Sequence, residues 1–73
     1  MNKYAVAHIS FFHNELEIRF VEADNWLEAL LKAFPEDYEW LRSDLNFTGE
    51  SPQEEGKQEA FNCDQMFDVK EIK

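Results

Sequence analysis

The sequence predicts a small α+β domain with the element order ββα(α)β, because three patterns follow one another along its 73 residues. Residues 3–22 resemble an antiparallel hairpin, residues 24–34 carry apolar side chains at helical spacing, and residues 66–72 alternate again. We expect the helix over 24–34 to cover one face of a three-stranded sheet. The expected strand order is 2-1-3, because a right-handed crossover would set the last strand beside the first.

The hairpin is predicted from the alternation of apolar and charged residues over 15–21. A two-residue turn at His13 and Asn14 is expected, because both residues tolerate positive φ better than most. The resulting apolar pairs are Phe11 with Leu16, Ile9 with Ile18 and Ala7 with Phe20. The resulting polar pairs are Phe12 with Glu15, Ser10 with Glu17 and His8 with Arg19. We therefore expect Ile18 on the face under the helix and His8 on the surface beside Arg19.

The first helix has a clear start and end in the sequence. Asp24 is the expected N-cap, with Asn25 as the alternative. Pro35 disfavours a helical conformation at Phe34, so the helix is expected to end there. The residues that share its apolar stripe are Trp26, Leu27, Leu30, Leu31 and Phe34.

Pro35 also suits the first position of a second, short helix. Glu36 and Asp37 would then lie in the first turn, where the helix dipole favours acidic side chains. Trp40 falls outside the apolar stripe of this helix. The expected inner face consists of Tyr38, Leu41 and Leu45.

The remainder of the single domain, residues 1–73, is less regular. Residues 49–59 contain both glycines and one of the two prolines, and they predict a flexible loop. Residues 61–65 either extend the last strand or form a turn. In the last strand itself, Phe67 and Val69 alternate with charged residues.

Charge is the strongest compositional signal, since sixteen Asp and Glu against seven Lys and Arg give a net charge of −9. Such a chain lacks the basic footprint that binds nucleic acid directly, and it does not suit an anionic membrane surface. Residues 35–68 hold ten of the acids and only two bases, Arg42 and Lys57. This distribution favours a basic protein surface as the partner, including the nucleic-acid groove of another protein.

The residues that carry chemistry are few. Cys63 is the only cysteine, which excludes an internal disulfide and favours a reducing cytoplasm. His8, His13 and Cys63 lack the spacing of a zinc site, so we expect no metal and no cofactor. No phosphate-binding loop or nucleophile motif is present, which predicts that the protein is not an enzyme.

The predicted partner-binding residues surround the second helix. They are the acids Glu36, Asp37, Glu39 and Asp44, with Trp40 as an apolar anchor. The strand-to-helix segment Val21–Leu30, with the sequence VEADNWLEAL, is similar to that of many short proteins encoded by phages and mobile elements.

Two functions of different kinds follow from these residues. The first is an inhibitor or modulator, encoded by a phage or mobile element, that mimics DNA and binds a nucleic-acid-binding protein in the host cytoplasm. The alternative is a small structural or accessory domain that forms a homodimer through Phe12, Trp40 or a free strand edge, with no decoy role.

Overall fold

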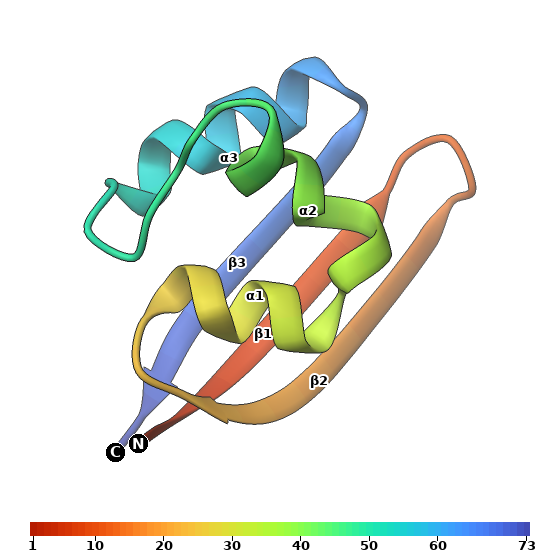
Figure 1. Ribbon diagram of the computed structural model, residues 1–73. Coiled ribbons are helices and arrows are strands. Elements are labelled where there is room, and N and C mark those ends of the chain that lie inside the picture. Colours follow the sequence, from red (N-terminus) through yellow and green to blue (C-terminus); the bar gives the residue numbers. More distant parts are fainter.

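The computed structural model describes all residues, 1–73, and confirms the predicted α+β class (Figure 1). The elements in chain order are β1 (Asn2–Ser10), β2 (Glu15–Ala23), α1 (Trp26–Ala33), α2 (Pro35–Ser43), α3 (Gln53–Asn62) and β3 (Gln65–Ile72). The sheet is antiparallel with the predicted order β2-β1-β3. All three helices lie on one face of it, with α3 beside β3 (Figure 1). None of the helices has the length and apolar character needed to cross a membrane.

The hairpin has a longer turn than the sequence predicts. Ser10 pairs with Glu15 and Ile9 with Leu16, so the turn spans residues 11–14, and the predicted two-residue turn and its pairing are wrong. Asn14 alone supplies the left-handed conformation, with φ of 54°. The observed register differs from the predicted one by two residues. Because side chains alternate with a period of two, the same residues still share each face.

The helices, however, cover the face predicted to be polar. The residues of β1 buried beneath the helices are Tyr4, Val6, His8 and Ser10. Leu16, Ile18 and Phe20 of β2 point to the opposite, uncovered side and are exposed. The expectation that Ile18 packs under the first helix, and that His8 lies on the surface, is therefore wrong.

The register of β3 explains which face the helices choose. Phe67 pairs with His8 and Val69 with Val6, so the apolar residues of β3 join the His8 side of the sheet. The apolar residues of β2 alternate in the opposite phase. The sheet is thus apolar on both faces, and three helices can cover only one of them.

The core lies between the helices and the sheet face of β1 and β3. Its wholly buried large side chains are Val6, Leu30, Tyr38 and Leu41. The fourteen buried members of the core are Tyr4, Val6, Ala23, Leu27, Ala29, Leu30, Leu31, Ala33, Phe34, Tyr38, Leu41, Ala60, Phe67 and Val69. Most of the stripe predicted for the first helix is among them, so that part of the prediction is confirmed.

The helix ends differ in detail from the predictions. The N-cap of α1 is Asn25, not Asp24, because Asn25 is extended and its Oδ1 accepts the backbone N–H of Glu28 at 2.9 Å. Pro35 is the first residue of α2, as predicted. Because α2 ends at Ser43, Leu45 lies beyond it and is exposed, and only Tyr38 and Leu41 of the expected inner face are buried.

Helix α3 replaces most of the predicted loop 49–59, which persists only over residues 49–52. Gly56 sits inside this helix, where a Cβ atom would lie 3.0 Å from Trp26 Cη2 and 3.2 Å from Phe67 Cζ. The glycine therefore permits close packing and does not mark a turn. Residues 61 and 62 end α3, and Asp64, with φ of 61°, turns the chain into β3.

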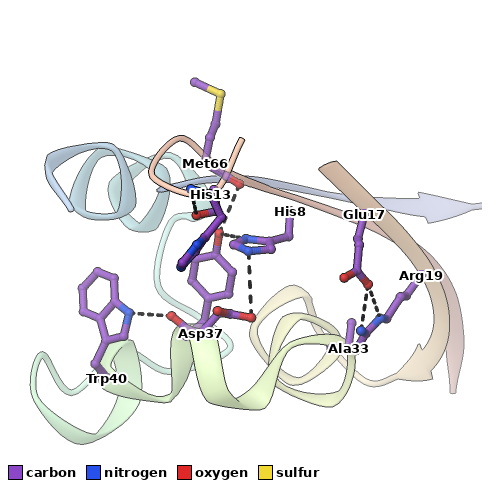
Figure 2. Close-up of polar contacts among 10 residues, drawn as sticks. His8, His13, Glu17, Arg19, Ala33, Asp37, Trp40 and Met66 are labelled. Carbon is purple, nitrogen blue, oxygen red and sulfur yellow. Dashed lines mark hydrogen bonds and ion pairs between the residues drawn. The ribbon is translucent and has the colours of Figure 1, made fainter. Parts of the chain in front are cut away.

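Arg19 holds strand β2 against the end of α1. Its guanidinium lies 4.6 Å from the centre of the Phe34 ring. It also donates to the carbonyl of Ala33, where the helix dipole is negative (Figure 2). It also pairs with Glu17 at 2.8 Å. Its backbone partner is Val6 and not His8, as a consequence of the shifted register.

Candidate protein-binding site

The structure brings the five predicted partner-binding residues together on and next to α2. Glu36, Asp37, Glu39 and Trp40 belong to the helix, and Asp44 is its C-cap residue. An α-helix has about 3.6 residues per turn, so residues three or four positions apart lie on the same side of it. The residues that follow one another along the outward stripe are therefore Glu36, Glu39, Trp40 and Asp44. Tyr38 and Leu41, on the other side of the helix, are wholly buried in the core. The helix is thus anchored by one side and presents acids on the other.

The acids of this cluster differ in their neighbours. Glu39 pairs with Arg42 at 3.1 Å, and Asp37 is half-buried, with Oδ2 at 3.9 Å from His8 Nε2. Asp44 accepts a hydrogen bond from the hydroxyl of Ser43 at 3.3 Å. Glu36 is exposed and forms no ion pair. Glu36 and Asp44 are therefore the carboxylates of the stripe that no base neutralises.

Trp40 is half-buried and packs against the edge of the core. Its indole Nε1 donates to the backbone carbonyl of Asp37 at 2.8 Å, which fixes the ring along α2 (Figure 2). A fixed aromatic ring with part of its surface exposed loses little conformational entropy when a partner covers it. Trp40 thus combines a structural contact with an exposed apolar surface.

A buried polar network that the sequence prediction missed lies directly beneath the acids. His8 Nδ1 is 2.6 Å from the hydroxyl of Tyr38, and that hydroxyl donates to the carbonyl of Met66 at 3.1 Å (Figure 2). The hydroxyl thus bridges the imidazole of His8 and the backbone of Met66. The Nε2 atom of His8 then faces Asp37. This network joins β1, α2 and β3 and fixes the orientation of α2 over the sheet.

The electrostatics of the network keep the tyrosine protonated. Burial of its hydroxyl, and to a smaller extent the negative charge of Asp37, raises the pKa of Tyr38 above its ordinary value of 10.0.

One sequence signal could have revealed that His8 is buried in this network, namely the alternation of Tyr4, Val6, His8 and Ser10 in β1. It was outweighed by the stronger alternation in β2.

The other titratable groups form no recognisable centre. No three His, Cys, Asp or Glu side chains lie close enough together to hold a metal ion. The thiol of Cys63 is free and exposed in the connection from α3 to β3. His13 lies in the hairpin turn, where its backbone N–H donates to the Ser10 hydroxyl at 3.3 Å.

The net charge is distributed unequally between the two sides of the sheet. We define the open sheet face as the outward residues of the three strands, namely Lys3, Ala5, Ala7, Ile9, Leu16, Ile18, Phe20, Glu22, Met66, Asp68, Lys70 and Ile72. Its two acids, Glu22 and Asp68, are balanced by its two bases, Lys3 and Lys70. The whole net charge of −9 is therefore carried by the helices, the loops and the helix side of the strands.

No family model matches the chain, and no curated protein or solved structure is significantly similar to it.

Proposed function

We propose that this protein is a non-enzymatic binding module that engages a basic protein surface through α2 and Asp44. The observation that carries the proposal is the uneven charge, because the open sheet face is neutral and the helices, the loops and the helix side of the strands bear the entire net charge of −9. A concentrated negative potential on one side orients the molecule as it approaches a positive partner and raises the association rate.

The rigidity of α2 supports a specific role for its acids. The helix is held by the buried Tyr38 and Leu41 and by the hydrogen bonds of the Tyr38 hydroxyl. Its outward carboxylates are consequently presented in a fixed geometry. Trp40, at the centre of the stripe, supplies the aromatic surface that dominates the energetics of many interfaces.

The partner class that best fits a rigid row of carboxylates is a protein whose groove binds the phosphates of nucleic acid. In this proposal the protein inhibits or modulates a host nucleic-acid-binding protein by mimicking DNA, as expected of a phage or mobile-element product. The proposed compartment is the cytoplasm, where an exposed thiol such as that of Cys63 stays reduced.

A capture experiment tests this proposal. The immobilised protein is exposed to a bacterial lysate freed of nucleic acid, and bound proteins are eluted with duplex DNA. The test variant is Glu36→Lys/Glu39→Lys/Asp44→Lys, and the control is Glu50→Lys/Glu54→Lys/Glu55→Lys, which changes the net charge equally but on the loop and α3. We expect the α2 variant to lose DNA-displaceable partners and the control to keep them.

The binding kinetics of a captured partner distinguish long-range electrostatic attraction from direct contact in the complex. Charge reversal on α2 should mainly slow association, whereas Trp40→Ala should speed dissociation by about 30-fold, corresponding to a ~2 kcal/mol hot spot. Circular dichroism establishes that each variant is folded. Capture of no DNA-displaceable protein, or equal capture by the α2 variant and the control, would contradict the proposal.

A further inference from the structure

The open sheet face exposes several large apolar side chains, and no helix of the chain covers them. Leu16, Ile18 and Phe20 are 64%, 58% and 72% exposed, and across the sheet Met66 and Ile72 are 39% and 44% exposed. All five belong to the same face by strand register. Contiguous exposed apolar patches of this kind mark interaction surfaces in proteins that are otherwise monomeric.

We propose that this face is the interface of a homodimer, in which a second copy of the chain packs its own open sheet face against it. Complete burial of the five side chains would remove on the order of 600 Å² from water per copy, close to the ~800 Å² per partner of a standard stable interface. The alanines and the charged rim supply the rest. The proposal is independent of the acids on α2.

The central rows of the face are complementary to themselves. The register aligns four rows across the strands β2, β1 and β3, which read Leu16–Ile9–Met66, Ile18–Ala7–Asp68, Phe20–Ala5–Lys70 and Glu22–Lys3–Ile72. A two-fold axis that runs perpendicular to the strands between the second and third rows reverses their order in the second copy. It sets Ile18 opposite Phe20, Asp68 opposite Lys70 and Met66 opposite Ile72. The two central rows thus pair Ile18 with Phe20 and Asp68 with Lys70, and Met66 meets Ile72 on the outer rows. The remaining outer pairs set the apolar Leu16 and Ile9 opposite Glu22 and Lys3.

Electrostatics permit this contact despite the acidity of the chain. The face itself is neutral, and the acids that make up the net charge lie on the helices, in the loops and on the helix side of the strands. Asp68 already binds Lys57 Nζ at 2.8 Å, so Lys70 of the second copy would add to an existing ion pair. Two sheets stacked in this way form an aligned sandwich with the helices outside.

The shape of the face agrees with the same arrangement. A shallow hollow of about 670 Å³ lies at one end of the face, next to Phe20, Ile72, Lys3 and Glu22, and extends round the edge of β2 to Val21 and to Lys32 of α1. The proposed axis places the row of Leu16 and its neighbours from the second copy over this hollow. The bulkier apolar end of one sheet would therefore meet the hollowed end of the other.

Sedimentation equilibrium of the full chain tests the dimer. We expect a species of twice the 8.7 kDa monomer mass that dissociates on dilution. Phe20→Ser should weaken dimerisation at least about 10-fold, whereas Phe12→Ser, which removes an even more exposed ring from the hairpin turn, should change it by less than about 2-fold. Both side chains are exposed, so neither change should unfold the domain.

Charge swaps test the axis itself. Asp68→Lys and Lys70→Glu should each weaken self-association, because like charges then face each other across the interface. A mixture of the two variants should form a heterodimer close to wild-type strength, since both contacts regain opposite charges. A chain that is monomeric at every concentration, a dimer unaffected by Phe20→Ser, or no recovery in the mixture would each overturn the proposal. The α2 charge-reversal variant should dimerise normally, so this outcome is separate from partner binding.

Discussion

Replacement of Tyr38 by phenylalanine removes one oxygen atom and tests the network that fixes α2. The side chain is wholly buried, and its hydroxyl bonds His8 Nδ1 at 2.6 Å and the carbonyl of Met66 at 3.1 Å. The aromatic packing on Phe67, with ring centres 5.1 Å apart, remains in the variant. The change therefore isolates the two hydrogen bonds from the packing of the ring.

The expected loss follows from the groups left behind. Without the hydroxyl, Nδ1 of His8 loses its hydrogen-bond partner in the core, and a buried unsatisfied polar group costs about 1–3 kcal/mol. The carbonyl of Met66 is only partly buried, so water compensates for some of its lost bond. We expect Tyr38→Phe to lower the free energy of unfolding by about 2 kcal/mol, a large fraction of the stability of a domain this small.

Urea denaturation at neutral pH, followed by circular dichroism, measures this loss. Tyr4→Phe is the matched control, because Tyr4 is also in the core but its hydroxyl forms no hydrogen bond within the protein. The control should cost less than about 0.5 kcal/mol. In a double-mutant cycle with His8→Leu, the two losses should be less than additive by about 1 kcal/mol or more. Equal effects of the two tyrosine replacements, or strict additivity with His8→Leu, would refute the network as a source of stability.

Three further predictions follow from the packing and the ionisation of the core. The raised pKa of Tyr38 means that the folded state keeps a proton that the unfolded state releases, so stability should be intact below pH 10.0 and fall above it by up to about 1.4 kcal/mol per pH unit. Alkaline melts should show a shallower fall for Tyr38→Phe than for wild type, and parallel curves would contradict the assignment. Leu30→Ala should cost about 2–5 kcal/mol and Ile18→Ala less than about 1 kcal/mol in urea melts at low protein concentration, since Leu30 is wholly buried and Ile18 lies on the uncovered face. Gly56→Ala should destabilise despite the better helix propensity of alanine, because Trp26 is held by stacking on Phe67 and by its bond to Ser51 and cannot move away; a rise in melting temperature would show that it can.

The sequence was sufficient for the elements whose signals are local. Alternation placed the three strands, and Pro35 placed the boundary between α1 and α2. The choice of Asn25 over Asp24 as N-cap was a matter of one residue, and both side chains can accept the same bond. These features depend on neighbours within a few positions, and a single chain displays them directly.

The covered face of the sheet could not be predicted from the hairpin alone. The alternation in β2 indicates an apolar face, but the phase of β3 relative to β1 decides which face the helices cover. That phase is set by a pairing across more than fifty residues of chain. The same limit hid the role of His8, since its burial depends on Tyr38 and Phe67 arriving from distant segments.

Gly56 shows a related limit in the choice between loop and helix. Glycine with nearby proline and charged residues is typical of a loop, yet here its missing side chain lets α3 approach Trp26 and Phe67. The grouping of the predicted partner-binding acids on and next to α2 could be predicted because these residues lie close together in the sequence. Their different neighbours, such as Arg42 for Glu39, required the folded structure.

The two proposed surfaces have a joint consequence because they lie on opposite sides of the sheet. In a face-to-face dimer the helices of both copies point outward, so each α2 stripe stays accessible and the two are held at a fixed separation. A basic partner with two equivalent grooves would then bind both stripes, and the second contact would form at a high effective concentration. The Phe20→Ser variant, which weakens the dimer interface, should lose this gain in affinity but should bind a single groove as tightly as the unchanged protein does. The loss would therefore appear only with a two-site partner, which distinguishes avidity from damage to the acidic site itself.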